Sequence, residues 1–73
     1  MDSRFNVGDT VKISSTSKYY IGSDGNPINV NGYVYQVENP KHNEDHNIDV
    51  RWDTKISNCY REVDLKLVKR REM

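Results

Sequence analysis

Hydrophobic and polar residues alternate in short segments along most of the chain, as they do in half-buried strands. The cleanest alternation runs from Asn47 to Asp53, where Ile48, Val50 and Trp52 share one face. Similar patterns predict strands at 10–14, 32–38 and 56–61, and a tight helical turn at 63–64 precedes a short closing strand at 65–68. Val34 and Val37 can both face the core only if a bulge separates them. The pattern therefore predicts five short strands.

A long polar connection, Ser15 to Asn31, follows the first strand and contains the turn signal Asp24-Gly25-Asn26-Pro27. Five short strands in a flat sheet would leave one face wet and two edges open. Curling of the sheet into a small, partly open barrel covers both. We therefore expect one all-β domain over residues 1–68, with Trp52 and Tyr60 completing a thin core, and a charged tail over 69–73.

Composition supports strands and excludes several classes of protein. Thirteen residues are Val or Ile, only two are Leu and none is Ala, which disfavours helices. A chain of 73 residues is too short for a two-domain enzyme, and its single cysteine cannot form an internal disulfide. No apolar run is long enough to span a membrane. We therefore expect a non-enzymatic cytoplasmic domain that needs no cofactor and has no membrane partner.

The order of several motifs resembles that of SH3-like barrels, the group that includes KOW and Tudor-type modules. These motifs are Val7-Gly8-Asp9-x-Val11-x-Ile13, Gly32-x-Val34-x-x-Val37, Ile48-x-Val50-Arg51-Trp52-Asp53 and Asp64-Leu65-x-Leu67-Val68. The Val-Arg-Trp-Asp strand is similar to mind-bomb-type barrels, and the Asn-rich, Ala-free composition is similar to short SH3-like proteins of tailed bacteriophages. The resemblance implies a five-stranded SH3-like barrel that binds a partner, in the host cytoplasm if the protein is phage-encoded.

Aromatic residues are the first candidates for a binding surface. Tyr19 and Tyr20 lie in the long connection, while Tyr33 and Tyr35 share the outward face of the second predicted strand. In SH3-like barrels that loop and the neighbouring sheet face often form the ligand surface. Exposed tyrosines are enriched at protein interfaces. We therefore expect a protein partner to be bound by Tyr19, Tyr20, Tyr33, Tyr35 and Arg51, although Tyr19 and Tyr20 could equally pack into the core.

Basic residues near the C-terminus support an alternative partner, RNA or DNA. The formal net charge is zero, whereas a general binder of phosphate backbones is normally basic. A polarised surface can nevertheless hide behind a balanced total. The alternative site would place its cations on phosphates and exposed tyrosines under bases. Its cations are Arg61, Lys66, Lys69, Arg70 and Arg71.

Residues able to carry other chemistry are few. His42 and His46, at the ends of His42-Asn43-Glu44-Asp45-His46, are weak candidates for a metal site, because the segment fits a solvated hairpin tip better. Cys59 has no base nearby in sequence and is expected to be a small buried hydrophobe. Asp49 and Asp53 flank Arg51, and the three fit a surface charge ladder.

Overall fold

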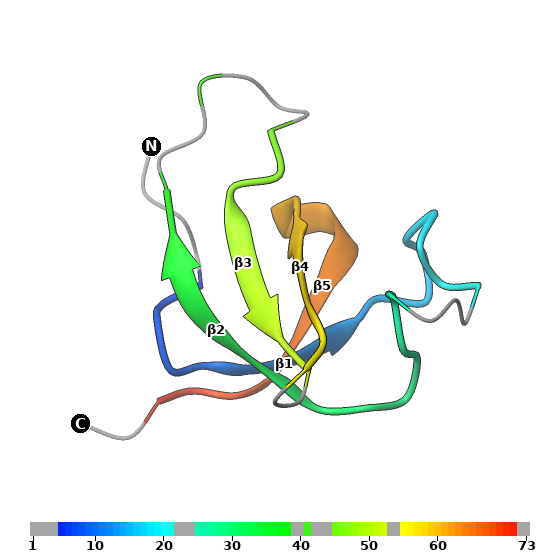
Figure 1. The fold of residues 1–73 in the computed structure, drawn as a ribbon, viewed down its shortest axis with the longest axis horizontal. Coiled ribbons are helices and arrows are strands. Elements are labelled where there is room, and N and C mark those ends of the chain that lie inside the picture. The colour runs from blue at the N-terminus through cyan, green and yellow to red at the C-terminus, as the bar shows by residue number, and fades with distance from the viewer. Residues whose placement is uncertain (1–4, 22–24, 39–40, 42–44, 53–54, 72–73) are drawn as a thin grey trace.

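The computed structural model describes residues 5–21, 25–38, 41, 45–52 and 55–71, which include five strands and one short 3-10 helix (Figure 1). The strands form a single antiparallel sheet in the order β4-β3-β2-β1-β5. No α-helix occurs among the described residues, so the predicted all-β class is confirmed. The elements are β1 (Thr10–Ile13), β2 (Gly32–Val37), β3 (Ile48–Arg51), β4 (Ser57–Tyr60), η1 (Glu62–Asp64) and β5 (Leu65–Lys69).

The sheet bends into an open, barrel-like form because its last strand returns to its first. β5 pairs with β1, and β1 pairs with only the first residues of β2, at Gly32 and Tyr33. The rest of β2 pairs with β3. In Figure 1, β1 consequently crosses the lower part of the view at a steep angle to β3 and β4.

The concave side of this sheet holds the core. Ile48, Val50 and Trp52 are all buried, as their alternation predicts. The Trp52 indole donates a hydrogen bond from Nε1 to the buried Tyr60 hydroxyl at 3.0 Å, which satisfies both polar groups. A Cβ at Gly32 would collide with the Trp52 ring, so the ring packs directly on the β2 backbone. The buried apolar set is Phe5, Val11, Ile13, Val34, Ile48, Val50, Trp52, Tyr60 and Leu65.

The expected bulge in β2 is present. The register with β3 shifts between Val34 and Gln36, so that Val34 is buried and Val37 is partly buried against the core. Tyr35, within the bulge, points outward and is 37% exposed. The bulge therefore turns both valines inward while keeping the tyrosines outside.

Two buried aspartates fix the ends of the sheet. Asp9 accepts hydrogen bonds from the backbone N–H groups of Asn6 and Arg71, each at 2.8 Å, and from Arg70 Nη1 at 3.1 Å. The turn before it needs Gly8, whose φ of 97° is left-handed. β5 includes Lys69, which the sequence assigned to the tail. Arg70 and Arg71 are held by Asp9 immediately beyond it.

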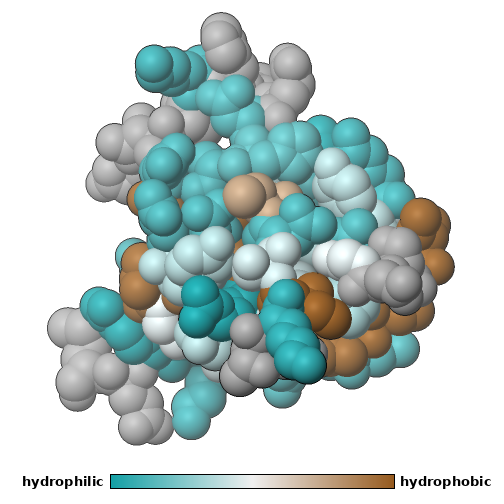
Figure 2. Space-filling model, viewed as in Figure 1, coloured by the Kyte–Doolittle hydropathy of each residue, from teal (hydrophilic) through white to brown (hydrophobic). Residues whose placement is uncertain are grey.

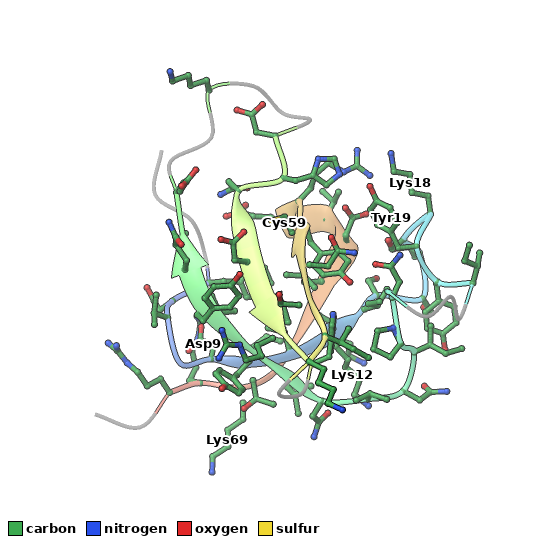
Figure 3. The ribbon with its side chains drawn as sticks, viewed as in Figure 1. Asp9, Lys12, Lys18, Tyr19, Cys59 and Lys69 are labelled. Atoms are coloured by element: carbon green, nitrogen blue, oxygen red, sulfur yellow. The ribbon has the colours of Figure 1, made fainter. Side chains whose placement is uncertain are left out.

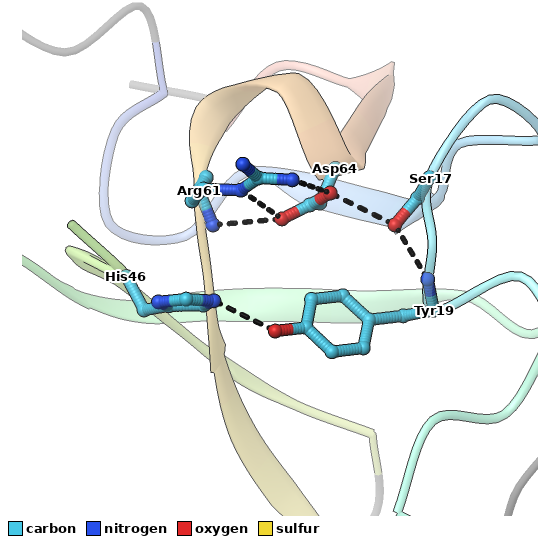
Figure 4. A network of polar contacts seen from close by, with 5 residues as sticks. All are labelled: Ser17, Tyr19, His46, Arg61 and Asp64. Carbon is cyan, nitrogen blue, oxygen red and sulfur yellow. Dashed lines mark hydrogen bonds and ion pairs between the residues drawn. The ribbon is translucent and has the colours of Figure 1, made fainter. Parts of the chain in front are cut away.

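The second buried aspartate, Asp64, fastens the long connection to η1 (Figure 4). Its carboxylate accepts hydrogen bonds from Ser17 Oγ at 2.9 Å and from Arg61 Nε and Nη2 at 3.0 and 3.1 Å. Burial raises the pKa of Asp64, but the bonds from Arg61 and Ser17 outweigh it and lower the pKa below its usual range. The connection is therefore docked on the barrel at Ser17.

Candidate functional site

Tyr19 and Tyr20, the first predicted anchors, lie half-buried against the core. The Tyr19 ring meets the Tyr60 ring edge-on at 5.7 Å, and its hydroxyl lies 2.7 Å from His46 Nε2 (Figure 4). Lys18 Nζ lies 5.3 Å from the Tyr19 ring centroid. Tyr19 thus ties the connection after β1 to the loop before β3, and much of its ring is covered by the protein itself.

Tyr33, Tyr35 and Arg51, the other predicted anchors, gather on the outer face of the sheet. Tyr33 of β2 lies directly opposite Arg51 of β3, and Tyr33 is 49% exposed. The Arg51 guanidinium lies over the Tyr35 ring, 5.0 Å from its centroid, in a cation–π contact. Residues opposite one another on neighbouring strands present their side chains on the same face. The three side chains therefore form one exposed group.

The register extends this group with lysines from the other half of the sheet. Tyr33 lies opposite Thr10 of β1, and Thr10 lies opposite Lys69 of β5. Lys12, two residues after Thr10, projects from the same face, and Lys66 lies directly opposite it. We call the resulting surface the basic-aromatic face; it consists of Lys12, Tyr33, Tyr35, Arg51, Lys66 and Lys69.

Lys12 is the member of this face that the sequence analysis missed. Its outward position could be read from the alternation of Val11 and Ile13, but its neighbours could not, because they come from the far end of the chain. Like charges directly opposite each other on neighbouring strands are destabilising. Neither Lys12 nor Lys66 has an ion pair with any residue that the structure describes. The repulsion between Lys12 and Lys66 therefore lowers the stability of the fold, and a bound anionic ligand would reduce that repulsion.

The basic-aromatic face lies apart from the tyrosines of the long connection. Figure 3 shows Lys12 and Lys69 in the lower half of the view, whereas Lys18 and Tyr19 lie at the upper right. Most residues on the visible side are hydrophilic, and apolar ones show mainly along its right and lower margins (Figure 2). The five predicted protein-binding residues are consequently divided between two separate regions.

The basic residues predicted near the C-terminus are divided as well. Lys66 and Lys69 belong to the basic-aromatic face, but Arg61 and Arg70 form ion pairs with the buried Asp64 and Asp9. Arg71 donates its backbone N–H to Asp9, and its side chain packs over Gly8. Arg61 and Arg70 are therefore each paired with a buried carboxylate, whereas Lys66 and Lys69 lie on the basic-aromatic face.

Cys59 is exposed, so the expectation of a small buried hydrophobe is wrong. Tyr60 takes the inward position of β4, and Cys59 therefore faces outward, opposite Asp49 of β3. Its thiol donates to Asp49 Oδ1 at 2.6 Å. Partial burial, followed by the Asp49 contact and the charge of Glu38, raises the pKa of Cys59 to about 11. The thiol is therefore protonated near neutral pH and is a poor nucleophile.

The remaining chemical candidates divide between described and undescribed residues. Within the described part of the chain, no group of three or more His, Cys, Asp or Glu is placed to hold a metal ion. His46 contacts the Tyr19 hydroxyl, whereas His42 lies outside the described residues. Asp53 of the predicted charge ladder also lies outside them. Of the other two residues of the ladder, Arg51 contacts the Tyr35 ring, and Asp49 accepts a hydrogen bond from the Cys59 thiol.

Comparisons of the chain with protein-family models, with curated proteins and with solved structures find no match. Among the described residues, none of the helical segments is long and apolar enough to cross a membrane.

Proposed function

We propose that this protein is a non-enzymatic binding module that holds a single strand of RNA or DNA on its basic-aromatic face. The observation that carries the proposal is the cross-strand row in which Lys69, Thr10, Tyr33 and Arg51 lie side by side, with the Lys12–Lys66 pair next to it. Binders of single strands combine cations that follow the phosphate backbone with aromatic rings on which bases stack. Both components are present here on one face.

The grouping of charge supports the same assignment. A net charge of zero argues against strong binding to any phosphate backbone. The ion pairs of Asp9 with Arg70 and of Asp64 with Arg61 remove equal numbers of negative and positive charges, so the remaining charges still sum to zero. Attraction to phosphates would therefore come from the local gathering of lysines and Arg51 on the basic-aromatic face.

A protein partner, the first expectation from the sequence, competes with this proposal for the same surface. Tyr33, Tyr35 and Arg51 belong to the basic-aromatic face, while Tyr19 and Tyr20 are half-covered by the barrel. A partner that uses only the exposed anchors would therefore meet lysines too and would need an acidic surface. The SH3-like assignment, the phage origin and the host cytoplasm as compartment rest on the resemblance of the sequence.

Fluorescence anisotropy with labelled 12-nucleotide oligo(U) and oligo(dT) tests the proposal. Each phosphate neutralised on a single strand contributes about −0.7 to the slope of log affinity against log salt concentration. The lysines and Arg51 of the face predict a slope of about −2 to −3. Lys12→Gln should reduce that slope, whereas Lys18→Gln, at an exposed site beside Tyr19, should leave it unchanged.

Loss of a base stack supplies a second readout. Tyr33→Ala removes an exposed ring and should weaken oligonucleotide binding by about 1–3 kcal/mol. Absence of binding at low salt, or binding that ignores both Lys12→Gln and Tyr33→Ala, would overturn the proposal. Capture from a bacterial lysate with and without nuclease then separates the rival: a protein that stays bound after nuclease treatment would indicate a protein partner.

A further inference from the structure

A groove lies beside β5, and neither Tyr33 nor Tyr35 of the basic-aromatic face lines it. It has a volume of about 540 Å³, within the range of ligand sites. Phe5, Leu65 and Leu67 give it an apolar lining, and Val63 of η1 stands beside them with 64% of its surface exposed. So exposed an aliphatic side chain next to a groove is suited to contact with an apolar ligand.

The polar lining of the groove has one sign of charge. Lys66 and Arg70 border it, and Arg70 keeps 55% of its side chain exposed while it pairs with Asp9. Ser14 and Thr16 add two hydroxyls, 2.9 Å apart, at the same groove. No acidic residue lines the groove among the described residues. A ligand that fits must therefore combine apolar groups with negative charge.

β5 is also an edge of the sheet, since β1 is its single neighbour among the strands that the structure describes. Edge strands bind extended peptides by strand addition, in which alternate side chains enter neighbouring pockets. We propose that the groove and the β5 edge together bind an extended acidic peptide segment of a partner protein. Large apolar side chains of that segment fill the space between Phe5 and Val63, and its carboxylates lie near Lys66 and Arg70.

This second site is independent of the proposed nucleic-acid function, although Lys66 borders both surfaces. A variant at Lys66 would therefore confuse them, and Val63 provides a cleaner handle. Val63→Asp places a negative charge at the groove, while Val63→Lys removes the same apolar group with the opposite charge. Both changes are at an exposed position, so the fold should survive them.

The experiment is selection of a random ten-residue peptide library, displayed on phage, against the immobilised protein. We expect enriched sequences that alternate Asp or Glu with Leu, Ile or Phe. Synthetic peptides with those sequences should bind Val63→Asp at least tenfold more weakly than they bind Val63→Lys. Ile21→Asp, which changes an even more exposed aliphatic residue outside the groove, should bind them as the unchanged protein does.

Cross-tests separate this proposal from the nucleic-acid proposal. Tyr33→Ala should leave peptide binding intact, and Val63→Asp should leave oligo(U) binding within about twofold. Failure to enrich acidic sequences, or equal binding to Val63→Asp and Val63→Lys, would overturn the peptide site and leave the nucleic-acid proposal standing. Titration with laurate adds one outcome: NMR shifts at Val63 and Leu67 without any selected peptide would assign the groove to a fatty acid and overturn the peptide proposal.

Discussion

Lys12 of β1 and Lys66 of β5 lie directly opposite each other in the sheet, although 53 residues separate them in sequence. Their ammonium groups repel each other, and no described residue forms an ion pair with either. Departures from favourable pairing of this kind are expected where a protein binds something. A change that removes this repulsion should therefore alter both the stability of the free protein and its binding of the proposed nucleic-acid ligand.

Lys12→Glu should stabilise the fold and weaken nucleic-acid binding at the same time. The change converts a repulsive cross-strand pair into an attractive one, which is worth about 0.2–1 kcal/mol. Urea unfolding should show a higher midpoint, while the anisotropy titration should show lower affinity for oligo(U). Lys18→Glu serves as the control and should change neither quantity appreciably. A Lys12→Glu protein that is less stable than the unchanged chain would contradict the assigned register.

Acid should unfold the protein through Asp9 and Asp64. Burial raises the pKa of Asp9, but hydrogen bonds from Arg71 and Asn6 and the charge of Arg70 outweigh it, so its pKa is lowered from 3.8. The pKa of Asp64 is lowered in the same way by Arg61 and Ser17. A carboxyl with a lower pKa in the folded state stabilises the fold above its unfolded pKa and loses that contribution as the pH falls through the folded value.

The free energy of unfolding should accordingly be level between pH 7 and 5 as far as these two groups are concerned, and should fall below about pH 4. Urea titrations at a series of pH values measure this. Asp64→Asn should lower stability at pH 7 and flatten part of the acid limb. An unchanged acid limb in both Asp64→Asn and Asp9→Asn would show that other carboxyls control acid unfolding.

Trp52 and Tyr35 should respond to truncation in opposite ways. Trp52 is buried and packs on Gly32 and Tyr60, so Trp52→Ala should cost about 3–5 kcal/mol. That loss is enough to unfold most of the population of so small a domain. Tyr35→Ala removes a partly exposed ring from the outer face and should leave thermal stability nearly unchanged while weakening oligonucleotide binding. A folded Trp52→Ala protein would place the indole outside the core.

Period-two alternation could be read from the sequence because it is a local property of each strand. Ile48, Val50 and Trp52 are buried as predicted, and the bulge between Val34 and Val37 was needed to place both inside. Long-range pairing could not be read in this way, since nothing local specifies that Lys66 lies against Lys12. The sequence analysis therefore predicted two separate sets of site residues, and the pairing of β1 with both β2 and β5 brings part of each set together.

Burial at β4 shows a second limit of the same reasoning. The segment Ser57–Tyr60 contains only one large apolar residue, so alternation did not decide which side Cys59 takes. Tyr60 occupies the inward position because its hydroxyl finds partners there in Trp52 Nε1 and Asn26 Oδ1, the latter at 2.6 Å. These partners come from the residue that follows β3 and from the long connection, and neither contact could be inferred from the β4 sequence.

Tyr19 should contribute more to stability than to binding. Its ring is half-buried against Tyr60 and its hydroxyl contacts His46, so Tyr19→Ala should lower the free energy of unfolding by about 1.5–2.5 kcal/mol, roughly half the cost for a fully buried aromatic. Tyr19→Phe keeps the ring packing and should lose only a few tenths of a kcal/mol, because the hydrogen bond is exposed. If Tyr19→Ala leaves the stability unchanged but weakens binding of an oligonucleotide or of a captured protein partner, Tyr19 is part of the binding surface.

Cys59 should react slowly with thiol reagents despite its exposure. Partial burial raises the pKa of Cys59, and the Asp49 carboxylate, which accepts a hydrogen bond from the thiol and repels a thiolate, raises it further, to about 11. Only the thiolate is a good nucleophile, so alkylation by iodoacetamide at pH 7.5 should be much slower than for a free cysteine, whose pKa is near 8.5. Asp49→Asn removes the charge and should accelerate alkylation at that pH, and the profile of rate against pH should move to lower pH values.

Lys55→Gln, at an exposed site outside this contact, provides the control. Equal rates for Asp49→Asn and the unchanged protein would show that burial alone suppresses the thiolate.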